Sequence, residues 1–107
     1  MTYLEAKYPG VKFVWWTMPI KTEGDKIRDE YNRLVRDYTR ANNKRLFDIA
    51  DIESHDPTGT AITNNNYPAQ FEGYSSDGGH LNEEGSQRVA LAWWQMMARL
   101  AGWNGQA

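Results

Sequence analysis

The sequence predicts an α/β protein, on the evidence of two apolar strand patterns, an amphipathic helix between them and a second long helix near the end. The expected order is strand, helix, strand, long loop and helix, which is typical of parallel strands with flanking helices. With 107 residues the chain has the length of one domain, which we expect to span residues 1–107.

The first strand is expected over Val11–Thr17, which is rich in β-branched and aromatic residues. Its nearly continuous apolar character is typical of a strand that is covered on both faces. The preceding residues Tyr3–Tyr8 have the pattern of a helix end, which Pro9 and Gly10 close, and such a helix is expected to have more chain before it. The loop at Pro19 leaves the carboxyl end of the strand, where parallel sheets build their sites.

A helix is expected over Asp25–Asn43, and a second strand over Arg45–Ile52. Together with the first strand they form a right-handed βαβ unit. Asp48 or Asp51 could lie near a site at the strand end, or cap the following turn. The apolar residues of the helix are Ile27, Tyr31, Leu34, Val35, Tyr38 and Ala41, and its charged face, expected in solvent, holds Arg28, Asp29, Arg33, Arg36, Asp37 and Arg40.

An irregular segment is expected over Glu53–Ser76, since Asn64–Pro68 has no pattern of a regular element. Structureless loops of this length are uncommon and often functional. His55 could share a metal with His80, although their spacing matches no known ligand set. Three aromatic residues could line an acyl or sugar pocket or fasten the loop to the core, namely Tyr67, Phe71 and Tyr74.

The final helix is expected over Glu83–Ala101, with Asn82 as its N-cap and Gly102 after its end. The apolar stripe of this helix is expected to be core. It comprises Val89, Ala90, Trp93, Trp94, Met96, Met97 and Leu100.

A carboxylate stands three residues before an imidazole in the stretch Asp77-Gly78-Gly79-His80, directly before the final helix. The glycines permit a tight turn that brings Asp77 onto the ring of His80. A carboxylate on Nδ1 fixes the tautomer and leaves Nε2 as a base. The alternative is a polar loop that ends in a helix cap.

The longer stretch Asp77-Gly78-Gly79-His80-Leu81-Asn82, with Gly85 and a helix behind it, resembles the last sequence block of the SGNH (GDSL-type) ester hydrolases. In that family the Asp and His of this block complete a Ser-His-Asp triad. The resemblance extends over roughly residues 5 to 102 and is specific only in this block. It implies a partial SGNH or flavodoxin-like three-layer fold, with Asp77 and His80 as catalytic residues and a small acyl or acetyl ester as substrate.

The family's nucleophile block and oxyanion-hole residues have no counterpart in this sequence. Gly24-Asp25 is followed by Lys26 and begins a helix. The serines are Ser54, Ser75, Ser76 and Ser86, and none is expected to be the nucleophile.

Composition excludes several classes of protein. The net charge is −2, and the sequence has no basic patch that would indicate nucleic-acid binding. The absence of cysteine excludes disulfides and thiolate chemistry. No apolar run reaches the roughly 20 residues of a membrane span. We expect no cofactor and no metal. The first ten residues carry charge and Pro9, unlike a signal peptide, and the localisation stays open.

Two hypotheses follow. The chain is the C-terminal part of an SGNH hydrolase that supplies the Asp-His pair, or it is a truncated, inactive α/β module that associates with itself. Two parallel strands do not make a stable sheet alone. Both hypotheses therefore expect completion by association, in a homo-oligomer or with a companion N-terminal half.

Overall fold

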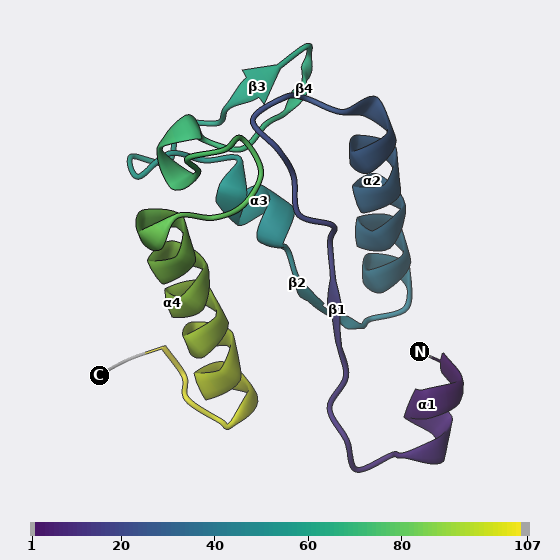
Figure 1. The fold of residues 1–107 in the computed structure, drawn as a ribbon. Coiled ribbons are helices and arrows are strands. Elements are labelled where there is room, and N and C mark those ends of the chain that lie inside the picture. Colours follow the sequence, from purple (N-terminus) through teal and green to yellow (C-terminus); the bar gives the residue numbers. More distant parts are fainter. Residues whose placement is uncertain (1, 106–107) are drawn as a thin grey trace.

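The computed structural model describes residues 2–105 and alternates helices with short strands (Figure 1). Met1 and residues 106–107 of the expected domain lie outside the described residues. The chain is a mixed helix and strand protein with a small parallel sheet, which is compatible with the expected α/β class. Its elements in order are α1 (Thr2–Lys7), β1 (Val14–Trp16), α2 (Lys26–Ala41), β2 (Arg45–Phe47), α3 (Ile49–Glu53), β3 (Thr63–Asn64), β4 (Tyr67–Pro68), the 3₁₀ helix η1 (Glu72–Tyr74) and α4 (Glu83–Leu100).

Strands β1 and β2 pair in parallel, with Trp15 opposite Leu46 and Trp16 opposite Phe47. The expected parallel βαβ unit is therefore present, with α2 as the connecting helix. Successive side chains of a strand point to opposite faces. The ring of Trp15 lies 5.0 Å from that of Tyr38 on α2, and the ring of Trp16 lies 5.2 Å from that of Trp93 on α4. Helices α2 and α4 thus cover opposite faces of the strand pair, as Figure 1 shows.

The expected second strand, Arg45–Ile52, is correct only as far as Phe47. The chain turns into α3 because the carboxylate of Asp48 accepts a hydrogen bond from the backbone N–H of Asp51, at 3.1 Å, and so caps a helix. The first strand is also shorter than expected, at Val14–Trp16. Its cover is incomplete, because Trp16 is exposed.

Helix α2 forms where expected, with Asp25 as its N-cap, but its polar side faces the body of the molecule. Asp29 is buried and pairs with Arg33 at 2.8 Å, so the prediction of a solvated charged face is wrong there. Part of the apolar stripe points outward, with Ile27 78% and Leu34 69% exposed, whereas Tyr38 packs against Trp15. Nothing in residues 2–105 covers the side chains of Ile27 and Leu34.

The segment between α3 and α4 is more regular than expected. Strands β3 and β4 pair antiparallel across Asn65 and Asn66, so the expectation that Asn64–Pro68 continues no regular element is wrong. Both asparagines have positive φ, 53° and 67°, which suits a two-residue hairpin turn. Tyr74 is buried and its hydroxyl donates to the His55 carbonyl at 2.8 Å, so this ring fastens the loop to the core.

Helix α4 begins as expected, since the side chain of Asn82 accepts from the backbone N–H of Gly85 at 3.0 Å. Gly102 follows the helix with φ of +107°. The prediction that the whole stripe is core is wrong for Ala90, Trp94 and Met97, which are exposed.

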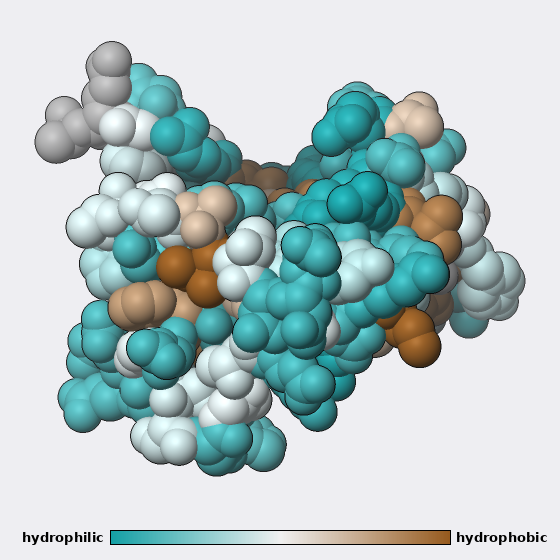
Figure 2. Space-filling model, turned by 90° about the horizontal axis from the view of Figure 1, so that it is seen from above, coloured by the Kyte–Doolittle hydropathy of each residue, from teal (hydrophilic) through white to brown (hydrophobic). Residues whose placement is uncertain are grey.

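An apolar groove of about 480 Å³ lies between β1 and α4. Apolar side chains line most of it, with Phe13, Val14, Trp16, Trp93, Met97 and Leu100 among them. Figure 2 shows several brown, apolar patches at the surface, separated by teal polar side chains. Within residues 2–105, no helix has the length and apolar character needed to cross a bilayer.

Gly85 lies where α4 meets the loop before it, and this contact makes a testable prediction. A Cβ at this position would lie 2.7 Å from the carbonyl oxygen and 2.8 Å from the Cβ of Tyr74. Alanine favours a helix interior over glycine by about 1 kcal/mol, but overpacking costs about 1–3 kcal/mol. We expect Gly85→Ala to lower the urea midpoint, whereas Ser86→Ala on the exposed neighbour changes it little. A midpoint at or above that of the wild-type chain would contradict the close packing.

Candidate functional site

Asp77 and His80 are in contact through the atoms that the sequence predicts. Oδ2 of Asp77 lies 2.7 Å from Nδ1 of His80. The other oxygen, Oδ1, accepts the backbone N–H groups of Gly79 at 2.9 Å and of His80 at 2.8 Å. One carboxylate therefore holds both the imidazole and the turn that carries it.

The turn requires one of its two glycines. Gly78 has φ of +88°, a conformation that side chains disfavour, whereas Gly79 has none of this strain and has room for a Cβ. Ser75 supports the turn from below: its Oγ accepts from the N–H of Gly78 at 3.0 Å and donates to Oδ1 of Asp77 at 3.1 Å. Asn82 then begins α4 two residues after His80.

These contacts decide the charge and the tautomer of the pair. The N–H of Gly79 first, and then the ring of His80, hold the pKa of the Asp77 carboxyl well below its ordinary value. An ionised carboxylate on Nδ1 makes this nitrogen the N–H donor, so that Nε2 carries the lone pair of the neutral ring. The His80 side chain is 94% exposed. The pair has the geometry of a general base that is open to a further group.

A segment distant in sequence packs against this turn. The loop that leaves the carboxyl end of β1 contacts it directly, because the N–H of Thr22 donates to the Gly78 carbonyl at 3.0 Å. Beside it, Lys21 lines a hollow of about 220 Å³ together with the residues from Asp77 to His80. The loop after the first strand therefore lies against the Asp77–His80 turn.

Two buried residues in this region were not expected from the sequence. Glu53 and Gln70 are each 1% exposed. Nε2 of Gln70 donates to Oε2 of Glu53 at 2.6 Å and to the carbonyl oxygen of Gly79 at 3.2 Å. Oε1 of Glu53 accepts the N–H of Ile20 at 3.2 Å, and burial raises the pKa of this carboxyl. No periodic pattern marks either residue in the sequence.

None of the serines is bonded to His80. Ser75 is bonded to Asp77, and Ser76 and Ser86 are exposed. The hydroxyl oxygen of Ser54 lies 3.5 Å from Nδ1 of His55 and forms no hydrogen bond with His80.

The group of Ser54, His55 and Asp51 is not a second triad, because Asp51 Oδ1 also lies on the Nδ1 side, at 3.7 Å. A triad needs the serine and the acid on opposite ring nitrogens. Instead, Nδ1 of His55 lies 2.7 Å from the carbonyl oxygen of Asp51, at the end of α3. No three His, Cys, Asp or Glu side chains within residues 2–105 are arranged to hold a metal ion.

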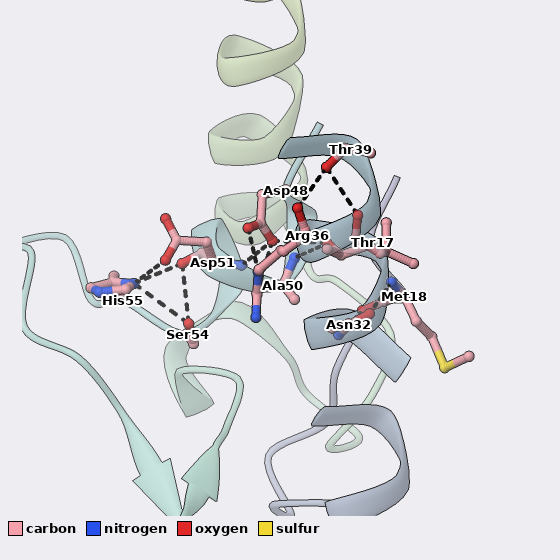
Figure 3. Close-up of polar contacts among 11 residues, drawn as sticks. Thr17, Met18, Asn32, Arg36, Thr39, Asp48, Ala50, Asp51, Ser54 and His55 are labelled. Carbon is pink, nitrogen blue, oxygen red and sulfur yellow. Dashed lines mark hydrogen bonds and ion pairs between the residues drawn. The ribbon is translucent and has the colours of Figure 1, made fainter. Parts of the chain in front are cut away.

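Asp48, the other acidic candidate, has a structural role, because its carboxylate bonds side chains of neighbouring elements (Figure 3). Its carboxylate accepts from Nε of Arg36 at 2.7 Å and from Oγ1 of Thr17 at 2.9 Å. Burial opposes ionisation of Asp48, but the hydrogen bonds from Arg36 and Thr17 outweigh it, and the pKa of this carboxyl is lowered. The interpretation of Asp48 as a cap is confirmed, and Arg36 is bound rather than solvated.

No protein-family model, curated protein or solved structure matches this chain.

The lowered pKa of Asp77 makes a prediction about acid. We expect the ¹³C carboxyl resonance of Asp77 to titrate below about 3.9, the value of an unperturbed aspartate. Because the folded pKa is lowered, this group adds stability above the unfolded pKa, and the contribution is lost as pH falls through the folded pKa. In His80→Ala the pKa should rise only in part, since the N–H of Gly79 still donates. A wild-type midpoint at or above the ordinary value would contradict the contacts.

Proposed function

We propose that the chain is the C-terminal part of an SGNH (GDSL-type) serine ester hydrolase, of the carboxylesterase, lipase or acetylesterase class. The observation that carries the proposal is the bond of 2.7 Å between Asp77 and Nδ1 of His80, one turn before the final helix. In this proposal the chain supplies the acid and the base of a triad, and its residues 1–107 form one part of the hydrolase domain.

The place of the pair supports the proposal. Ligands in open α/β sheets bind beyond the carboxyl ends of the parallel strands. The turn at Gly78 is bonded to Thr22, which lies on the loop that leaves the carboxyl end of β1. The helices α2 and α4 on opposite faces of the strand pair agree with part of a three-layer, flavodoxin-like fold.

The chemical roles follow from the orientation of the ring. Nε2 of His80 takes the proton of a serine hydroxyl while the serine oxygen attacks the ester carbonyl. The carboxylate of Asp77 stabilises the imidazolium that forms. The imidazolium then returns the proton to the leaving alcohol, and a water molecule repeats the cycle on the acyl-enzyme. A short acyl or acetyl ester is the proposed substrate.

The serine and the oxyanion donors come from outside the residues described. Ser75 is excluded as the nucleophile, because its hydroxyl donates to Asp77 and accepts two backbone N–H groups of the same turn. The proposal therefore includes a companion N-terminal half that carries a Gly-Asp-Ser block.

The second candidate function is that of an inactive module that associates with itself. The observation that favours it is the outward apolar stripe of α2, with Ile27 and Leu34 largely exposed, together with the apolar groove beside Trp16. Apolar surface of this kind marks an interface.

Hydrolysis of p-nitrophenyl acetate distinguishes the two functions. The chain alone is expected to show little or no turnover, because it lacks the nucleophile. Joined to an N-terminal SGNH half with its Gly-Asp-Ser block, it is expected to be active, and His80→Ala should lower that activity by roughly 10²–10⁴-fold.

Ser75→Ala and Ser76→Ala are the controls in the chain alone. Robust turnover by the isolated chain that one of them abolishes would show that a local serine is the nucleophile. Activity of the joined protein that survives His80→Ala would remove the pair from the mechanism.

Association makes a separate prediction. Light scattering at micromolar concentration should give a mass above the 12.3 kDa of one chain. A charge on the stripe, in Leu34→Glu, should shift the mass toward that of one chain, because burying an unpaired carboxylate is costly. Gln95→Glu, which adds a charge at an exposed position of α4, should leave the mass unchanged. A wild-type mass of one chain would exclude self-association.

A further inference from the structure

Two successive peptide groups of the Asp77–His80 turn are each held at both ends. The N–H of Gly79 and the N–H of His80 both donate to Oδ1 of Asp77. The carbonyl of the first peptide, at Gly78, accepts from the backbone and hydroxyl of Thr22 at 3.0 and 3.3 Å. The carbonyl of the second, at Gly79, accepts from Nε2 of Gln70 at 3.2 Å. Gln70 is thus the side chain that holds the peptide directly attached to His80.

The orientation of the Gln70 amide is dictated by its neighbours. Its Nε2 faces two acceptors, the carboxylate of Glu53 at 2.6 Å and the carbonyl of Gly79. A flipped amide would place its oxygen against both of them. The buried Oε1 of Gln70 has no hydrogen-bond partner among the described residues. An unsatisfied buried acceptor is costly, so the two donated bonds must outweigh it for the amide to stay there.

Glu53 is fixed in turn by the main chain. Its Oε1 accepts from Ile20, on the loop after β1, and its own carbonyl accepts from the N–H of Phe71 at 2.9 Å. The N–H of Gln70 donates to the Lys21 carbonyl at 2.8 Å. Because Glu53 and Gln70 are 1% exposed, these bonds are shielded from water.

We propose that Gln70, oriented by Glu53, is a positioning residue that sets the direction of the His80 ring through the carbonyl of Gly79. The inference rests on the proposed role of His80 as a base, but it concerns the ring geometry and not the reaction. Asp77 bonds the ring and both N–H groups of the turn. Gln70, which is buried in the core, bonds the carbonyl of Gly79 and so holds the turn to the rest of the molecule. Without Gln70, the second peptide keeps its N–H bond to Asp77 but loses the bond at its carbonyl end, so that the peptide and the attached imidazole are less constrained.

The test is the ratio of the two tautomers of the neutral His80 ring, measured by ¹⁵N NMR at alkaline pH. In the wild-type chain the Nδ1–H form should predominate. Gln70→Met has a similar length and no donor, and it should shift the ratio by at least twofold toward that of an unconstrained histidine. Tyr74→Phe is the matched control, since it removes a buried hydrogen bond to His55 and leaves the turn untouched. An unchanged ratio in folded Gln70→Met would overturn the inference.

A second measurement needs no variant. The side-chain NH₂ of Gln70 should exchange with D₂O more slowly than that of the exposed Gln95, because both of its protons are donated in a buried position. Equal exchange rates would overturn the inference even if Gln70→Met does not fold.

Hydrolysis provides an independent readout in the joined protein described above. Gln70→Met should lower kcat by roughly ten- to a hundredfold with KM little changed, since a misplaced base acts on the chemical step. An unchanged kcat in an active joined protein would overturn the inference. A joined protein with no hydrolysis at all would contradict the proposed function, and the tautomer ratio would still test the role of Gln70.

Discussion

The carboxylate of Asp48 is the interaction on which the arrangement of the first half of the chain depends. It accepts from Thr17 at the end of β1, from both Nε and Nη2 of Arg36 on α2, and from the N–H of Asp51 in α3. Thr17 in turn accepts the N–H of Ala50 at 3.0 Å. One acid therefore joins a strand, its crossover helix and the helix that follows. The polar side of α2 faces inward because the groups that it bonds lie there, and Ile27 and Leu34 of the apolar stripe are left exposed.

Local patterns were sufficient to predict most of the elements. The spacing of apolar residues in α2 and the cap at Asn82 depend on residues within a few positions, and both are present. The errors have two different causes, one distant in sequence and one local. The strand expected through Asp48 ends early because Thr17 and Arg36 hold its carboxylate as a cap. The hairpin was missed because Asn65 and Asn66 both adopt positive φ, which asparagine tolerates but does not signal clearly.

The same distinction holds at the site. The contact of Asp77 with His80 spans three residues and could be predicted from the turn alone. The support beneath it could not, because Glu53 and Gln70 lie 17 positions apart and meet only through the fold. Thr22 is still farther away, 56 positions before Gly78. A pair of residues close in sequence is therefore easier to predict than the distant residues that position it.

The exposure of His80 has a consequence for the energetics of its pair with Asp77. In water the attraction between a carboxylate and an imidazolium is strongly screened by the high dielectric constant. The same two groups interact several times more strongly once solvent is excluded. Whatever covers this turn therefore changes the strength of the pair as well as its access to a substrate. The turn fixes the orientation of the two groups, and the dielectric of the surrounding medium sets the strength of their interaction.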